Sequence, residues 1–144
     1  MSVLWFDGLL AQTNDAGVYF LPDTDVDELL EAAAVNRFPC LRVNLHGCHA
    51  RQDLLLRLAG VLALPPHVVE QWADVPQAIT QGRPDGAPGM VFVLEHSEDL
   101  RAQSPEDFKQ AMEALQAASA AWAAQGLPLW SFIVVDEVEF DALG

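Results

Sequence analysis

The chain has 144 residues, of which 51% are hydrophobic, and a formal net charge of -14 at pH 7. This size and composition predict a single globular domain over residues 1–144. The negative field excludes nucleic acid and anionic membrane surfaces as expected partners and favours encounter with a basic protein. The alternative is that the acidity serves solubility alone, as it does in many cytoplasmic proteins.

Three further features predict a cytoplasmic location. The N-terminus, MSVLWFDGLLAQ, lacks the basic region of a signal peptide and carries an acid at Asp7. No apolar run reaches the ~18–20 residues that a membrane span requires. The two cysteines, Cys40 and Cys48, suit a reducing compartment better than a disulfide scaffold. We therefore expect no contact with a membrane.

The first third of the chain predicts two short strands with a helix between them. Residues 17–21 form an apolar run that ends at a proline, which is typical of a short strand. Thr24 offers an N-cap for a helix that continues to about Asn36 with one apolar face. Residues 40–45 alternate apolar and polar side chains, as strands do, before a glycine turn.

The rest of the chain continues this alternation. A helix is predicted over residues 50–63, and the prolines after it end it because a residue before proline is pushed out of the helical region. Residues 90–94 form a continuous apolar run, typical of a strand covered on both faces. Ser-Pro-Glu-Asp begins the strongest predicted helix, residues 104–126, which ends at a glycine. Residues 129–135 predict the last buried strand, and the acidic tail, residues 136–141, is expected to be only partly ordered.

Strands that alternate with helices predict an α/β fold. We expect a largely parallel sheet of about three strands, with helices packed on its faces. The strand and helix of residues 17–36 are expected to add an edge strand to the same sheet.

Polar residues cluster around the turn after the second predicted strand, and they suggest a metal site or a catalytic site as alternative functions. Cys40, His46, Cys48 and His49 carry ligands that suit zinc, but the paired spacing of a four-ligand structural site is missing. Cys48 and His49 are adjacent, and adjacent side chains in a turn point apart, which disfavours a nucleophile beside its base. His96 follows a predicted strand at its carboxyl end, where α/β sites tend to lie. We expect no enzyme activity, metal or cofactor. A small enzyme or metal protein that uses Cys48, His49 and His96 is a third hypothesis, beside the two given at the end of this subsection.

From about Cys40 to Val135, about two-thirds of the chain, the sequence resembles the barstar family of intracellular ribonuclease inhibitors. The resemblance rests on LRVNLHGC at residues 41–48, LLLRLAGVLALP at 54–65, MVFVLEH at 90–96 and the run from Phe108 to Val135. It implies a barstar-like layered core over residues 40–136 that binds a protein and has no catalytic activity. Residues 1–39 then form an N-terminal extension that packs on the sheet.

The resemblance also implies a partner-binding surface just after the leucine-proline that ends the first helix of the core. On the family's pattern Trp72 matches outright and Gln71 is a near substitute for asparagine. The expected contact residues are His67, Glu70, Gln71, Trp72, Asp74 and Gln77. Two acids of the pattern fall instead on Ala73 and Gln77, and a third, on the last helix, falls on Ala121.

These substitutions remove charges with which family inhibitors mimic phosphate in a cationic active site. In the barnase–barstar pair, the family's reference complex, close charge pairs couple by ~1.5–7 kcal/mol and truncating one inhibitor aspartate costs ~7.7 kcal/mol. Losing three such acids would remove most tight binding to that enzyme. Asp74 lies one residue from an expected acid, and one helical step turns a side chain by ~100°. Proline is tolerated in the first turn of a helix, so Pro76 is compatible with a helix that starts late, near Asp74.

The first hypothesis is a non-enzymatic inhibitor or immunity partner of a basic ribonuclease or toxin other than the usual family target. Trp72 would be its apolar anchor, with Glu70 and Asp74 as charge partners; the alternative for Trp72 is a core position on a short helix. Three further acids would add steering, namely Glu95, Glu98 and Asp99. The second hypothesis is a barstar-fold domain that has lost inhibition and acts in regulation or assembly, for which a homo-oligomer stays open.

Overall fold

The computed structural model describes residue 10 and residues 15–143 of the chain. In chain order its elements are β1 (Val18–Pro22), α2 (Val26–Val35), β2 (Cys40–Asn44), α3 (Arg51–Val61), α4 (Val75–Gln81), β3 (Met90–Glu95), α5 (Glu98–Gln103), α6 (Pro105–Ala123), β4 (Leu129–Val135) and α7 (Glu137–Leu143). The N-terminal sequence from which we expect no signal peptide lies, apart from Leu10, outside the described residues.

The strands form one parallel sheet of four strands in the order β1-β4-β3-β2. Every residue of β4 and the first five residues of β3 are buried, because helices cover both faces of these central strands. The two continuous apolar runs therefore predicted the central strands correctly. β1 pairs only with β4 and extends the sheet on that side, which confirms the added edge strand.

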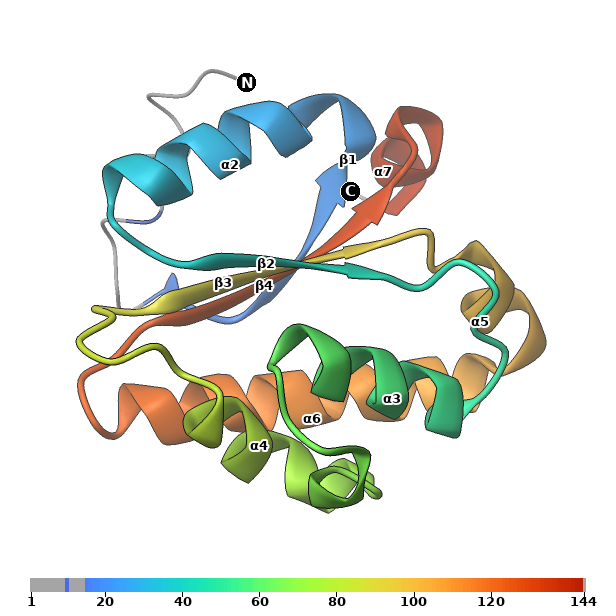
Figure 1. The fold of residues 1–144 in the computed structure, drawn as a ribbon. Helices are drawn as coiled ribbons and strands as arrows, with labels where there is room; N and C mark the ends of the chain where they lie inside the picture. Colours follow the sequence, from blue (N-terminus) through green and yellow to red (C-terminus); the bar gives the residue numbers. More distant parts are fainter. Residues whose placement is uncertain (1–9, 11–14, 144) are drawn as a thin grey trace.

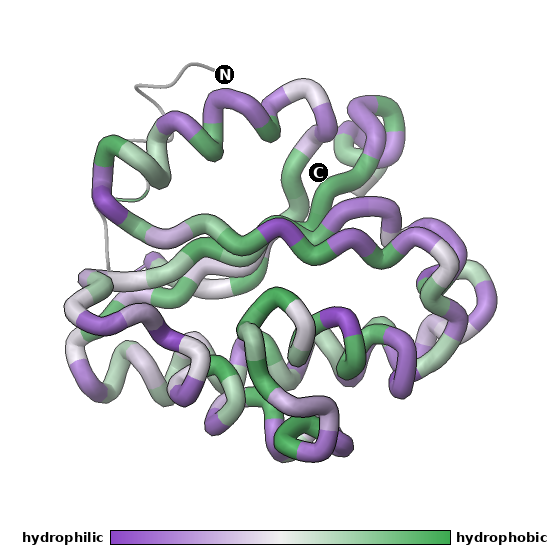
Figure 2. The backbone as a smooth tube through the Cα atoms, in the orientation of Figure 1, coloured by the Kyte–Doolittle hydropathy of each residue, from purple (hydrophilic) through white to green (hydrophobic). Residues whose placement is uncertain are grey.

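Helices lie on both faces of this sheet (Figure 1). α2 covers one face and packs on Val91, Val93, Trp130 and Phe132. α3, α4 and α6 cover the other face, where they enclose Phe92 and a second apolar core. Figure 2 shows largely hydrophobic strands in the centre and hydrophilic residues along the loops and outer helical turns. Among the described residues no helix is long and apolar enough to cross a membrane.

The start of α2 differs from the prediction. Thr24 is not its N-cap, because a 3-10 turn over Asp23–Asp25 follows the proline that ends β1. α2 begins at Val26, and Asp25 is its cap residue without a side-chain cap bond. Thr24 is instead an exposed residue of the turn.

The acidic tail also differs, since it forms helix α7 where partial order was expected. The side chain of Asp136 accepts the N–H of Glu139 at 2.6 Å, which stabilises the first turn. Arg101 of α5 forms an ion pair with Glu139. The helix is therefore supported by a contact from a distant part of the chain.

The start of α6 is tied to the loop that precedes α3. Ser104 occupies the predicted N-cap position, but its hydroxyl donates to the carbonyl of His49 at 2.5 Å and makes no cap bond. The carboxylate of Asp107 accepts the N–H of Arg51 at 3.0 Å and so satisfies a donor in the first turn of α3. These bonds fix α3 and α6 side by side under the sheet.

Candidate protein-binding surface

The candidate surface begins where α3 ends. Ala63 adopts a left-handed backbone conformation with φ 57°. The N–H of Leu64 bonds to the carbonyl of Ala59 at 3.0 Å, which closes the helix in the way a glycine usually does. The chain thus leaves α3 in a fixed direction before it reaches the two prolines.

Two 3-10 turns, Pro66–Val68 and Trp72–Asp74, lie between α3 and α4. α4 then starts at Val75, with Pro76 in its first turn, where a missing N–H costs no helical hydrogen bond. The late start that Pro76 leaves open is therefore the one observed.

Asp74 holds this loop in shape. Its Oδ2 accepts the backbone N–H groups of Glu70 and Gln71, each at 3.1 Å. In return the Gln71 side chain accepts the N–H of Asp74, which completes a capping box. One oxygen of the Asp74 carboxylate is thereby committed within the chain, and Asp74 is half-buried.

Replacing Asp74 with alanine is expected to lower the free energy of unfolding by about 1–2 kcal/mol, because two backbone N–H groups lose their acceptor. Urea unfolding measures this loss. Glu31→Ala is the matched control, since Glu31 is an exposed acid in the middle of α2. Equal stability of the two variants would show that the loop does not depend on the Asp74 carboxylate.

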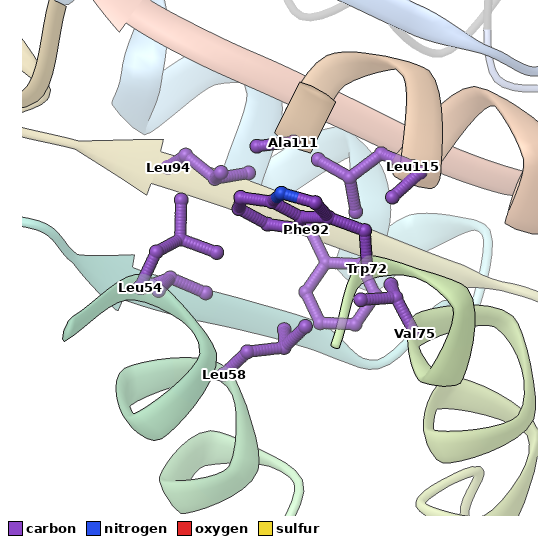
Figure 3. Close-up of a pocket in the computed structure, with 10 residues that line it drawn as sticks. Leu54, Leu58, Trp72, Val75, Phe92, Leu94, Ala111 and Leu115 are labelled. Atoms are coloured by element: carbon purple, nitrogen blue, oxygen red, sulfur yellow. The ribbon is translucent and has the colours of Figure 1, made fainter. Parts of the chain in front are cut away.

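Trp72 points into the core beneath the loop (Figure 3). Its indole ring lies among apolar side chains from α3, α4, β3 and α6, which include Leu54, Leu58, Val75, Phe92, Leu94, Ala111 and Leu115. The indole Nε1 is buried and has no hydrogen-bond partner within the described residues. This packing agrees with the alternative of a core tryptophan. The role of Trp72 as an anchor for a partner stays a prediction.

The four remaining predicted contact residues, His67, Glu70, Gln71 and Gln77, are exposed, but they do not all lie together. Glu70, Gln71 and His67 line an open groove of about 600 Å³ between the loop and the outer side of α3, where Arg51 and Gln52 complete its polar lining. Gln77 lies on α4 and is not part of the groove lining. The apolar part of the groove consists of Leu55, Leu56, Pro66 and Val69.

Leu56 is an exposed apolar residue of the groove, and sequence analysis missed it, as it missed Arg51 and Gln52. It is 57% exposed, an unusual position for a leucine on a helix that otherwise buries its leucines. Its neighbours Leu54 and Leu58 share one face of α3, and at ~100° per residue Leu56 lies on the opposite face. A leucine outside the apolar stripe of the helix was thus the sequence feature that could have identified Leu56 as a surface residue.

The three positions at which family acids are missing are all exposed. Ala73 lies in the second 3-10 turn, Gln77 in α4 and Ala121 near the end of α6. α4 packs directly against α6, so these elements share one side of the molecule (Figure 1). The expected carboxylates are therefore missing at three positions whose side chains reach solvent.

The acids expected to add steering lie elsewhere. Glu95 ends β3, and Glu98 and Asp99 begin α5, at the opposite end of the molecule from α4 in Figure 1. Arg42 donates to both carboxylate oxygens of Glu95, at 2.6 and 2.8 Å. These hydrogen bonds hold the pKa of Glu95 below its usual value. The Glu95 side chain thus forms an ion pair with Arg42 of the same chain and does not lie beside the loop.

Replacing Arg42 with glutamine is expected to raise the pKa of Glu95 back toward its usual value. A lowered pKa in the folded state means that the pair stabilises the protein above the unfolded-state pKa and that this stability is lost as the pH falls through the folded-state pKa. An NMR titration of the Glu95 side chain measures the change. Lys109→Gln removes an exposed cation of α6 as a control, and an equal shift in both variants would contradict a local effect.

The residues of the metal and nucleophile alternatives have different surroundings. Cys48 is fully buried, and burial raises the pKa of its thiol, as burial raises the pKa of Cys40 to about 11. A buried, protonated thiol is a poor nucleophile. The rings of His46 and His96 lie 6.3 Å apart, while His49 is exposed. In the part of the chain that the structure describes, no group of three or more His, Cys, Asp or Glu side chains is placed to hold a metal ion.

Comparison with known proteins places this fold and loop in a family. A family model described as Barstar (barnase inhibitor) matches residues 38–134, about two-thirds of the chain. A search of curated proteins gave no match. The matched region contains β2, β3, α3 to α6 and all but the last residue of β4, whereas β1 and α2 precede it. The family is one of inhibitors and not of catalysts. The chain therefore belongs to the barstar (barnase inhibitor) family.

Proposed function

We propose that this chain is a cytoplasmic inhibitor or immunity partner of a basic ribonuclease or toxin other than barnase. One observation carries the proposal: the family scaffold and an ordered loop are retained, while the acids expected at Ala73, Gln77 and Ala121 are absent from exposed positions. The net charge of -14 supports a basic partner. Two free cysteines suit a reducing compartment.

The proposed contact area, called the loop surface below, consists of His67, Glu70, Gln71 and Gln77 together with Leu56 of α3. Glu70 is its exposed acid and pairs with a cation of the partner. Leu56 supplies apolar area of the kind that dominates the centre of an interface. Trp72 and Asp74 act from beneath, because they fix the loop against the core.

This composition supports a partner other than barnase. A surface whose groove combines one exposed acid with the cation Arg51 and the apolar Leu56 does not mimic phosphate, so it does not match an active site that selects for several carboxylates. It suits a partner that presents an apolar side chain beside a single lysine or arginine. The partner's basic character then governs the rate of association more than the strength of the complex.

The test is inhibition of RNA cleavage by basic ribonuclease toxins encoded next to this gene. We expect the chain to form a complex with one of them, and Leu56→Glu to weaken binding at least tenfold because a charge enters a groove that loses water on binding. Val35→Glu is the matched control: Val35 is 62% exposed, close to the 57% of Leu56, but lies on α2 across the sheet.

Two outcomes would contradict the proposal. Equal weakening by Leu56→Glu and Val35→Glu would show that the loop surface is not the contact. A light-scattering mass clearly above 15.7 kDa, with no inhibition of any basic ribonuclease, would favour the alternative of a domain that acts in assembly.

A further inference from the structure

We propose that the outer edge of β1 binds an extended apolar segment of a partner protein, flanked by lysine or arginine, as a fifth strand of the sheet. β1 precedes the region that matches the family and contributes no residue to the loop surface. The inference is therefore independent of the proposed inhibition.

One side of the β1 backbone pairs with β4, and the other side has no neighbouring strand among the described residues, although α7 also contacts β1. The N–H of Ser131 donates to the carbonyl of Gly17 at 2.9 Å, and the parallel register pairs Val18 with Ser131. In such a ladder alternate residues point their backbone N–H and C=O groups toward the neighbouring strand, so those of Tyr19 point toward β4. The N–H and C=O groups of Val18 and Phe20 then point away from the sheet. Within the described residues no backbone hydrogen bond to these groups is found.

The open side is bordered by an apolar groove of about 320 Å³ between β1 and α6. Its lining is mostly apolar and consists of Val18, Tyr19, Phe20, Ile133 and Met112, with Glu113 and Gln116 as a polar rim. Phe20 is 39% exposed and lies beside Ile133 in the sheet register. Sheet edges are usually protected by charged side chains, but β1 reads VYFLP and carries none. An added strand would cover both the unpaired backbone and Phe20.

The charges around the edge select the partner's chemistry. Asp15 precedes β1, Asp23 and Asp27 follow it, and Glu113 lies on the groove rim; all four are exposed. A bound segment would therefore have its ends near carboxylates, which favours lysine or arginine on both sides of an apolar centre.

A second copy of the chain fits this edge poorly. Closed two-fold pairing requires antiparallel β1 strands, and pairing Val18 with Phe20 of the other copy centres the axis on Tyr19. That arrangement sets Asp15 opposite Asp23 of the other copy, in a pair of chains that each carry -14. Like charges directly opposite each other are destabilising. A basic partner strand has the opposite effect.

The experiment is amide hydrogen exchange followed by NMR on the full chain. In the free protein we expect the amides of Val18 and Phe20 to exchange fast and those of Tyr19 and Leu21 to be protected. The probe is a short peptide of alternating valine and threonine with two lysines at each end. It is expected to slow exchange at Val18 and Phe20 at least tenfold, while the same peptide with glutamates in place of the lysines has no effect.

Variants locate the binding. Phe20→Lys and Met112→Glu each place a charge in the groove and are expected to abolish protection by the peptide. Val35→Lys is the matched control, because Val35 is also exposed, at 62%, but lies at the end of α2 and is not part of the groove lining. Chemical shifts away from the substitution check that each variant is folded.

Four results would overturn the inference. The first is no added protection by the lysine peptide, and the second is an equal loss of protection with Val35→Lys. The third is slow exchange of Val18 and Phe20 in the free monomer, which would mean that the chain covers its own edge. The fourth is a dimer that Phe20→Lys dissociates, which would assign the edge to a second copy.

Discussion

Replacing Trp72 with alanine is expected to lower the free energy of unfolding by about 3–5 kcal/mol, because the indole ring fills space between α3, β3 and α6. Urea unfolding followed by far-UV circular dichroism measures the change. A residue that served only as an anchor for a partner would leave stability nearly unchanged when truncated. The variant therefore separates the two interpretations of Trp72.

Trp72→Phe is the control for this prediction. It keeps an aromatic ring in the same site and removes the indole N–H, which is buried without a partner in the described structure. We expect it to cost less than about 1.5 kcal/mol. A cost below ~1 kcal/mol for Trp72→Ala, together with a large loss of partner affinity, would contradict a mainly structural role.

Introducing aspartate at both Ala73 and Gln77 is expected to increase affinity for barnase by at least about tenfold per residue. Close charge pairs in the barnase–barstar complex itself couple by ~1.5–7 kcal/mol, and ~1.4 kcal/mol corresponds to a factor of ten. Both positions are exposed, so the new carboxylates reach solvent without disturbing the core. Isothermal titration calorimetry of the wild type and the double variant measures the gain.

The double variant Gln103→Asp with Gln125→Asp adds the same charge at exposed positions of α5 and of the turn after α6. An equal gain in barnase affinity from this control would show that the added negative charge acts only through long-range attraction. No gain from Ala73→Asp with Gln77→Asp would indicate that the 3-10 turn before α4 aims position 73 away from the partner. Either result would contradict restoration of the family contact.

The central part of the fold was predictable because its signals are local. The buried strands β3 and β4 are apolar at successive positions, which only a doubly covered strand requires. Gly126, at φ 76°, ends α6 as expected, since the left-handed conformation there favours glycine. The start of α2 and the tail helix α7 were not predictable, because they depend on a turn after Pro22 and on the ion pair between Arg101 and Glu139.

The candidate surface was predictable in location but not in orientation. The family's pattern pointed to residues 67–77, and the structure gives this segment exposed residues beside a groove. The family's pattern alone, however, does not decide whether the Trp72 side chain faces a partner or the core. That orientation depends on where the turn before α4 begins, which the mutual hydrogen bonds of Gln71 and Asp74 fix. The contribution of Leu56 depends on the path of the loop over α3.

The route of α2 makes the N-terminal extension inseparable from the rest of the protein. The helix leads from β1, at one edge of the sheet, to β2, at the other, and covers the face that carries Trp130 and Phe132. A fragment cut at residue 38, where the family match begins, would open that whole apolar face to water. Patches of that kind cause aggregation. We therefore expect the extension and the family-matched region to melt in one cooperative transition, and the smallest unit that folds to be larger than the unit that sequence comparison delimits.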